Sequence, residues 1–251
     1  MKTIRGILFD IGGVLYVGDR VIEGAPQTIA LLQRDYPIRF LTNTTRRTPE
    51  TVLHKLRHMG FSVTPETLFT ALDAAKRYIQ EREGTLYPLL TDEATAWFSD
   101  YRSDKPDFVL VGDAWHNFDY THLNTAFRAL KEGAKLLAAA KNRYFLDNDG
   151  KLSMDAGGFI AALEYAAETE AEIIGKPSKA FFHLAVDSMG LKPDEVLMVG
   201  DDITSDIAGA QAAGLRAALV KTGKFSESDL DKGITPDVVL PDVTALPTVL
   251  L

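Results

Sequence analysis

The sequence contains no cysteine among its 251 residues, so disulfide bonds and thiol chemistry are excluded. It also lacks an apolar run of membrane-spanning length, and its first residues, MKTIRGILFD, do not form a signal-peptide pattern. We therefore expect a cytoplasmic protein that has no membrane partner. Ser- or Gly-rich linkers, internal repeats and low-complexity segments are absent as well, which argues against separate domains joined end to end.

Basic residues are the scarcer charged class. The chain has 27 Lys and Arg against 35 Asp and Glu, which gives a formal net charge of −8. Nucleic acids and anionic membranes are bound through basic surfaces, so we expect no nucleic acid as a main partner. A local basic pocket for a small anion is still compatible with this composition.

Short apolar runs alternate with amphipathic stretches along the chain. The clearest runs are IRGILFD, IRFLTN, DFVLVGD, AEIIGK, EVLMVGDD and RAALVKTG. Runs this short and apolar are typical of strands buried on both faces, and their alternation with helices indicates a parallel sheet. We predict an α/β fold with a Rossmann-like, doubly wound parallel sheet. Residues 76–175 form a second α/β set, which predicts a smaller cap domain inserted into a core made of residues 1–75 and 176–251.

Four predicted strand ends carry polar or charged residues. They are Asp10, then Thr42-Asn43-Thr44, then Lys176 between Gly175 and Pro177, and finally Asp201-Asp202 with Asp206 close behind. Ligands of doubly wound sheets bind at the carboxyl ends of the strands, so we expect these four ends to converge on one site. Each also has a structural explanation: a turn or helix cap for the aspartates, an N-cap for the threonines and an exposed turn for the lysine.

The chemistry of these residue types fits phosphate and a divalent cation. Hydroxyl and amide donors suit phosphate oxygens, and a lysine neutralises phosphate or a carboxylate pair as a point charge. Three carboxylates within a few residues repel unless a cation neutralises them, which favours Mg²⁺ held together with a substrate phosphate. Arg46 and Arg47 either add charge to this site or are simply solvated.

The order of these residues, with a lone Asp first and the acidic cluster last, resembles the four motifs of the haloacid dehalogenase superfamily. The stretches TNTTRRT, GGFIAALEYA, IIGKPSKAFF, MVGDDITSDIAGAQAAG and VKTGKF are similar to subfamily IIA, the NagD-like phosphatases, in which an α/β cap lies between the second and third motifs. Within it the chain is most similar to the branch that contains phospholysine phosphohistidine inorganic pyrophosphate phosphatase. The similarity covers essentially the whole chain.

This resemblance implies a role for each strand-end residue. Asp10 would be the nucleophile that forms an aspartyl-phosphate, and it would bind Mg²⁺ with the Gly12 carbonyl and Asp201. Thr42 would bind the transferring phosphoryl group with help from Asn43 and Thr44, and Lys176 would stabilise both that group and Asp10. The remaining acids, Asp202 and Asp206, would support the metal site from behind. The implied substrate is a small phosphorylated molecule.

Gly12 departs from the family pattern. Most members carry a second Asp two residues after the nucleophile, which protonates the leaving group and is typically worth ~10²–10⁴-fold in rate. One hypothesis is an enzyme for good leaving groups, such as phosphoramidates or pyrophosphate, with a phosphomonoester also open. The alternative is a catalytically weak or inactive protein that binds a phosphorylated ligand or a partner protein.

Several further segments give weaker signals. Asn148-Asp149-Gly150 predicts a tight hairpin turn near the cleft, and residues 142–146 beside it are candidates for substrate contact. In GDAWHNFDY we interpret Gly112-Asp113 as a turn, with Trp115 and Phe118 packing in the cap. His54 and His58 share a helical spacing but lack zinc motifs, which favours a solvated face. Caps of this kind often mediate dimers, so we expect a homodimer.

Overall fold

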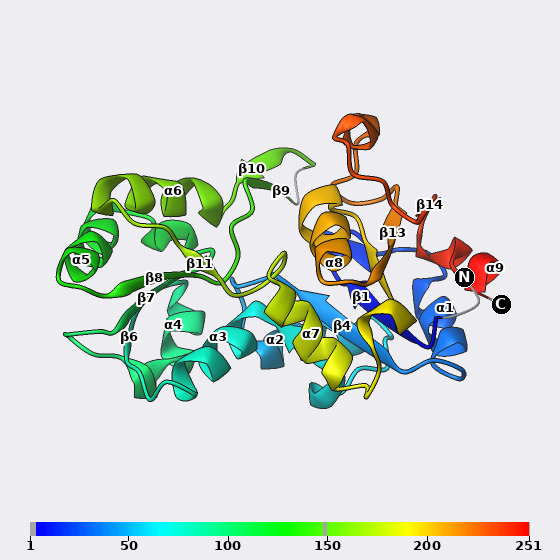
Figure 1. The fold of residues 1–251 in the computed structure, drawn as a ribbon, viewed down its shortest axis with the longest axis horizontal. Coiled ribbons are helices and arrows are strands. Elements are labelled where there is room, and N and C mark those ends of the chain that lie inside the picture. The colour runs from blue at the N-terminus through cyan, green and yellow to red at the C-terminus, as the bar shows by residue number, and fades with distance from the viewer. Residues whose placement is uncertain (1–3, 148–149, 251) are drawn as a thin grey trace.

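The structure is a computed structural model that describes residues 4–147 and 150–250. It contains two parallel sheets, a larger one near the chain termini and a smaller one made from the middle of the chain (Figure 1). Among the described residues, no helix is both long and apolar enough to cross a membrane. The two-sheet α/β architecture confirms the predicted fold class.

The larger sheet has six parallel strands, and the nucleophile candidate ends one of its central strands. The order is β14-β13-β12-β1-β4-β5. All five residues of β1 are buried, as their continuous apolar run predicts. The strands are β1 (Gly6–Asp10), β4 (Ile38–Thr42), β5 (Leu68–Thr70), β12 (Val196–Gly200), β13 (Arg216–Val220) and β14 (Val238–Leu240).

Alternate side chains of these strands enter two apolar layers, so both faces of the sheet are covered. One layer holds Ile7 and Phe9 and packs against α1 (Ala25–Leu32), α2 (Pro49–His58) and α9 (Pro247–Leu250). The other layer holds Leu8 and packs against α3 (Ala71–Gln80), α7 (Lys179–Asp187), the π-helix η5 (Ile203–Ala208) and α8 (Gly209–Ala212). This is the doubly wound arrangement.

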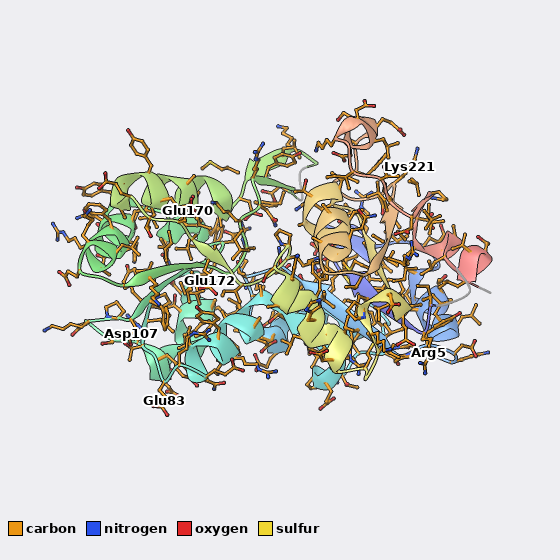
Figure 2. All side chains as sticks on the ribbon, viewed as in Figure 1. Arg5, Glu83, Asp107, Glu170, Glu172 and Lys221 are labelled. Atoms are coloured by element: carbon orange, nitrogen blue, oxygen red, sulfur yellow. The ribbon has the colours of Figure 1, made fainter. Side chains whose placement is uncertain are left out.

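The smaller sheet has four parallel strands in the order β11-β8-β7-β6. Its strands are β6 (Leu86–Leu89), β7 (Phe108–Val111), β8 (Lys135–Ala138) and β11 (Glu172–Ile173). One face packs against α5 (Tyr120–Lys131) and α6 (Ala156–Ala167), and the other against α3 and α4 (Asp92–Trp97). Charged side chains such as Glu83, Asp107, Glu170 and Glu172 lie on the outside of this region (Figure 2).

Short elements complete the chain. Two antiparallel hairpins are formed by β2 (Tyr16–Val17) with β3 (Arg20–Val21), and by β9 (Tyr144–Leu146) with β10 (Leu152–Met154). The 3₁₀ turns are η1 (Pro65–Thr67), η2 (Ser99–Tyr101), η3 (Trp115–Asn117), η4 (Pro193–Glu195), η6 (Glu227–Asp231) and η7 (Val243–Ala245). The β9–β10 hairpin lies over the space between the two sheets (Figure 1). In its predicted turn, Asn148 and Asp149 lie outside the described residues.

One expectation about the sheet is wrong. The strand before Lys176 was expected at the same sheet edge as the other three motifs, but β11 pairs with β8 in the smaller sheet. Its two residues, Glu172 and Ile173, align in parallel with Leu137 and Ala138 of β8, so Lys176 leaves the edge of the smaller sheet and not that of the larger one. The predicted partition at residue 75/76 falls inside α3, and the division into core and cap stays a prediction.

Candidate active site

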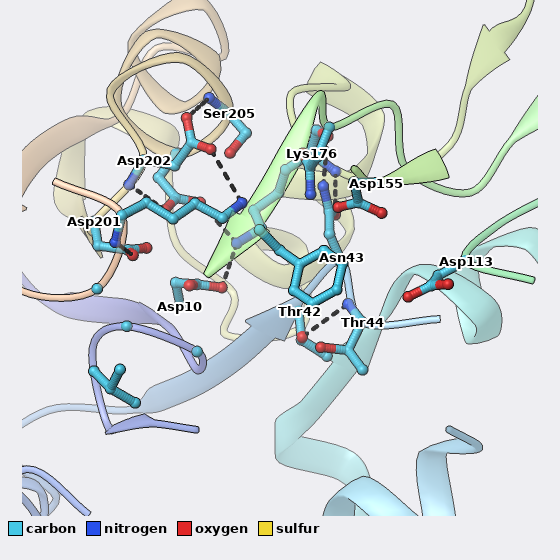
Figure 3. Close-up of a pocket in the computed structure, with 18 of the residues that line it drawn as sticks. Asp10, Thr42, Asn43, Thr44, Asp113, Asp155, Lys176, Asp201, Asp202 and Ser205 are labelled. Carbon is cyan, nitrogen blue, oxygen red and sulfur yellow. Dashed lines mark hydrogen bonds and ion pairs between the residues drawn. The ribbon is translucent and has the colours of Figure 1, made fainter. Parts of the chain in front are cut away.

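Asp10 and Lys176 form a buried ion pair in a pocket that all four predicted strand ends line. Lys176 Nζ lies 2.5 Å from Asp10 Oδ1 and 2.7 Å from Asp206 Oδ1 (Figure 3). Lys176 is 2% exposed and Asp10 is 8% exposed. Burial lowers the pKa of Lys176, but the two carboxylates outweigh it and hold the pKa above its ordinary value. The lysine is therefore a fixed cation against the carboxylate that ends β1.

The two acids that follow Asp201 in the sequence, Asp202 and Asp206, have different partners. Asp202 caps η5 and accepts hydrogen bonds from the N–H groups of Thr204 and Ser205, at 2.9 and 3.0 Å. Asp206 is fully buried against Lys176 and also accepts the Asp202 N–H at 3.2 Å. Burial, together with the charges of Asp10 and Asp202, raises the pKa of Asp206 to about 7, although Lys176 opposes this. The capping explanation therefore accounts for Asp202 alone.

The surroundings of Asp201 favour a bound cation. Asp201 is 2% exposed, and its Oδ2 accepts a hydrogen bond from the Lys224 backbone N–H at 2.7 Å. Burial and the charges of Asp10 and Asp206 raise its pKa well above the ordinary value. Oxygen atoms of Asp10, Asp201 and Asp206 lie within 4.8 Å of one another. Such a set of buried carboxylate oxygens fits a hard divalent ion such as Mg²⁺.

The threonine motif supports the lysine as well as the pocket. Asn43 is hydrogen-bonded to Lys176 twice: its Nδ2 donates to the Lys176 carbonyl at 2.8 Å, and its Oδ1 accepts the Lys176 N–H at 2.9 Å. Thr42 is buried and its Oγ1 accepts the Thr44 N–H at 3.0 Å, which leaves the hydroxyl proton for a ligand. The motif thereby connects the end of β4 to the segment after β11, which compensates for that strand's place in the other sheet.

In the loop after β1, a side chain would fit at Gly12 but not at Gly13. A Cβ atom on Gly12 would meet no atom within 4 Å, and its backbone φ is not in the left-handed region. Gly13 has φ +87°, and a Cβ there would lie 2.0 Å from Asp201 Oδ2. Gly13 is therefore required by conformation and contact. Gly12 is exposed in the pocket and could accept a side chain.

A second wall of the pocket comes from the region around the smaller sheet. The pocket has a volume of about 300 Å³, and this wall includes Asp113, Asn142, Phe145, Asp147 and Asp155. Asp113, which follows β7 and was interpreted as a turn residue, also forms an ion pair with Arg46. Its Oδ2 lies 2.9 Å from Arg46 Nε. The expected proximity of residues 142–146 to the cleft is confirmed for Asn142 and Phe145.

Two other expectations for this region had opposite outcomes. Phe118 packs as expected, stacked on Phe159 with ring centroids 3.8 Å apart. The expected packing of Trp115 is wrong: it is 58% exposed, and the Arg46 guanidinium lies 5.5 Å from its ring centroid. His54 and His58 are exposed on α2, and neither lines the pocket.

Lys224 is a pocket residue that the motif analysis left without a role. It follows β13 in the VKTGKF stretch, where a Gly-Lys pair shortly after a strand is the one sequence signal for it. Its Nζ lies 3.4 Å from Asp202 Oδ2. Burial lowers its pKa, but the nearby acids, Asp202 first, raise it above the ordinary value. The site thus holds a second ammonium group beside Lys176.

Family models match both ends of the chain. The model described as haloacid dehalogenase-like hydrolase matches residues 7–102, and a second, described as HAD-hydrolase-like, matches residues 173–246. Together these ranges include all the strand-end residues that meet in the pocket.

Curated relatives align over nearly the full length. Haloacid dehalogenase-like hydrolase domain-containing protein 2 from Bos taurus is 38% identical over 232 residues, covering 92% of this chain and 89% of its own. Phospholysine phosphohistidine inorganic pyrophosphate phosphatase from Danio rerio is 36% identical over 253 residues, covering 98% and 93%. Among solved structures, p-nitrophenyl phosphatase from Archaeoglobus fulgidus superposes with a TM-score of 0.90 at 25% identity, covering 98% and 99%.

Proposed function

Because the chain belongs to the haloacid dehalogenase-like hydrolase family, in its NagD-like subfamily IIA, we propose that it is a Mg²⁺-dependent phosphatase for small phosphorylated substrates. The observation that carries this proposal is the buried ammonium of Lys176 between Asp10 and Asp206, beside the buried Asp201 carboxylate, whose oxygen lies within 4.8 Å of oxygens of both acids. Relatives named as phosphatases support the same reaction class.

Asp10 is the proposed nucleophile. Its carboxylate oxygen attacks phosphorus, the bond from phosphorus to the leaving group breaks, and an aspartyl-phosphate forms on Asp10; water then releases phosphate. Lys176 neutralises charge on the phosphoryl oxygens and holds the Asp10 carboxylate in position through their ion pair. The Thr42 hydroxyl would bind a phosphoryl oxygen, helped by Thr44, whose N–H donates to Thr42 Oγ1, while Asn43 fixes the backbone of Lys176.

Asp10, the Gly12 carbonyl and Asp201 are the proposed Mg²⁺ ligands. Bound there, the ion would neutralise the substrate phosphate and orient it toward Asp10. Asp202 stabilises the start of η5, which carries Asp206 against Lys176. Phosphoryl transfer depends mostly on positioning and charge neutralisation, and this arrangement of residues supports both.

Gly12 shapes the proposed substrate class. Without an acid at this position, leaving groups that need little protonation are favoured, as in pyrophosphate, phosphoramidates and activated phosphomonoesters. One relative is named for phospholysine, phosphohistidine and inorganic pyrophosphate, which supports the same class. The pocket volume of about 300 Å³ also favours small molecules.

The test is a hydrolysis screen over phosphate esters, pyrophosphate and phosphoramidates, with Mg²⁺ and with EDTA, beside an Asp10→Asn variant. We expect Mg²⁺-dependent release of phosphate that falls by on the order of 10⁴-fold or more in Asp10→Asn. Equal activity of wild type and Asp10→Asn would refute the assignment of Asp10 as the nucleophile. Mg²⁺ binding without turnover of any substrate would favour the alternative, a protein that binds a phosphorylated ligand or a partner.

A homodimer is a further part of the proposal. Tyr165 is 89% exposed on α6, and Leu152 and Met154 on β10 are 63% and 62% exposed. Exposed large apolar side chains such as these can contribute to contact with another chain. Sedimentation equilibrium should give twice the mass of one chain, and a monomeric mass would contradict this.

A further inference from the structure

The loop that carries Lys224 is fastened to the loop that carries Asp10. Thr222 Oγ1 donates a hydrogen bond to the Gly13 carbonyl at 2.5 Å. Gly223 has φ +62°, and a Cβ atom on it would lie 2.5 Å from Gly13 Cα and 2.0 Å from Asp201 Oδ2. Only glycine allows the two loops to approach this closely. The position of Lys224 is therefore set by the same segment that contains Gly12.

Among the described residues, the Lys224 ammonium has fewer hydrogen bonds than it has donors. Within the part of the chain that the structure describes, its one hydrogen bond is the 3.4 Å contact with Asp202 Oδ2, whereas the Lys176 ammonium has two contacts of 2.7 Å or less. An ammonium group has three donors. Its side chain is 22% exposed and lines the pocket, so it can be reached by a bound molecule.

Gly12 lines the same pocket, with open space where a Cβ would be. The position of the usual acid is thus vacant, while a cation from the adjoining loop enters the same pocket. An acid at position 12 would donate a proton to the leaving oxygen; a lysine nearby can instead stabilise that oxygen as an anion. Lysine is charged at neutral pH, so this needs no proton transfer.

Resting on the proposed phosphatase function, we propose that Lys224 is a catalytic residue that stabilises the negative charge of the leaving group, in place of the acid missing at Gly12. As the Asp10 oxygen–phosphorus bond forms, the bond between phosphorus and the leaving oxygen breaks. Its electron pair stays on that oxygen, which departs as an anion beside the Lys224 ammonium. Bulk water protonates the anion after release, and Lys224 keeps its proton throughout.

The experiment measures kcat/KM for a series of substituted phenyl phosphates whose leaving groups differ in basicity. In Lys224→Met we expect a loss of about 10²-fold or more for phenyl phosphate and about 10-fold or less for p-nitrophenyl phosphate, because more localised charge needs more stabilisation. The matched control is Lys221→Met, three residues earlier. Lys221 is exposed, pairs with Glu227 at 2.9 Å and lies on the core side away from the smaller sheet (Figure 2), so its profile should match wild type.

Two more variants separate this role from a structural one. The Lys224 backbone N–H, which binds Asp201, is kept in every substitution, so the Mg²⁺ concentration for half-maximal stabilisation should stay within about 2-fold. Lys224→Arg keeps the charge and should keep the wild-type slope against leaving-group basicity. Adding Gly12→Asp to Lys224→Met should restore most of the phenyl phosphate activity, since the aspartic acid supplies a proton.

The outcomes are distinct. An equal loss for all leaving groups, or no loss, would overturn the role of Lys224 while leaving the phosphatase intact. If Lys224→Met does not fold, Lys224→Arg is the deciding variant. Its slope of kcat/KM against leaving-group basicity must then match that of wild type, and a different slope would overturn the proposal. If wild type and Asp10→Asn do not differ on any substrate, the proposed function itself fails, whatever Lys224 does.

Discussion

The two walls of the pocket differ in how firmly their charged groups are held. On the core wall, Lys176, Asp10 and Asp206 are buried and joined by contacts of 2.5 and 2.7 Å. At the opposite wall, Asp113 pairs with Arg46, which reaches across from the end of β4; their side chains are 18% and 31% exposed, and the guanidinium also lies over the rings of Trp115 and Phe145.

The difference separates two tasks. Buried charges in short contact cannot rearrange cheaply, so the core wall suits chemistry that is the same for every substrate. A half-exposed arginine between aromatic rings can change partner at little cost, so the other wall suits recognition of the part of the substrate that varies. Substitutions on the two walls should therefore affect different quantities.

Removing the core cation should have the largest effect. Lys176→Met leaves Asp10 and Asp206 buried and unpaired, so we expect a loss of kcat of about 10³-fold or more. The free energy of unfolding should fall by about 3–5 kcal/mol without Mg²⁺. Stopped assays with p-nitrophenyl phosphate and urea melts would measure both. Lys179→Met, an exposed lysine three residues later, serves as the control. A stable, active Lys176→Met protein would remove the distinction between the walls.

Adding the missing acid should raise activity. Gly12→Asp places a side chain in open space, so the fold should tolerate it. We expect kcat for phenyl or alkyl phosphates to rise by about 10²-fold, and less for p-nitrophenyl phosphate, which needs little protonation. Comparison of kcat across the two ester types checks this. An unchanged kcat in a folded, Mg²⁺-binding variant would show that another step limits the rate.

The stability of the core wall should depend on pH and Mg²⁺. Burial and neighbouring acids raise the pKa of Asp206 to about 7, so the folded protein without metal binds this proton more tightly than the unfolded chain. Its contribution to stability is present below the ordinary aspartate pKa and is lost as pH rises through about 7. In EDTA, Tm should therefore fall between about pH 5 and about pH 8.

Mg²⁺ should oppose this fall by neutralising the acids, so the Tm increase on adding it should be larger at the higher pH. Asp206→Asn removes the titrating group and should flatten the EDTA profile. Scanning calorimetry at several pH values would measure the difference between the two proteins. A wild-type profile that is no steeper than that of Asp206→Asn would contradict the assigned cause.

The smallest effect is expected on the recognition wall. Arg46→Gln removes the ion pair with Asp113, and we expect the ratio of kcat/KM for p-nitrophenyl phosphate over pyrophosphate to change by about 3–10-fold, with kcat nearly constant. Arg47→Gln is the matched neighbour, because Arg47 is 61% exposed and pairs with Glu93 away from the pocket. A uniform loss of kcat in Arg46→Gln would place this arginine with the chemistry instead.

The core wall could be predicted from the sequence because each of its residues directly follows a buried apolar run. Asp10, Thr42 and Asp201 stand at the carboxyl ends of neighbouring parallel strands, and topology alone brings them together. Lys176 was identified from its position between Gly175 and Pro177, although its strand belongs to the other sheet.

The opposite wall could not be predicted in the same way. Asp113 and Phe145 come from a loop and a hairpin whose approach to Arg46 depends on how the two sheets are packed, which local patterns do not encode. Trp115 was misassigned for the same reason, since aromatic residues usually pack in cores but this one is exposed and lies against the Arg46 guanidinium. Lys224 needed the contact between two loops to acquire a role.

Helix α3 has a consequence for how the protein unfolds. Its buried side chains Leu72, Ala75 and Ile79 belong to one apolar cluster that contains Leu8 and Met198 from the larger sheet and Leu110 and Leu137 from the smaller one. Neither sheet can lose its structure without exposing part of the other's interior. Amide hydrogens on β1 and β7 should therefore exchange with solvent water through the same rare global opening, and thermal unfolding should be a single cooperative transition.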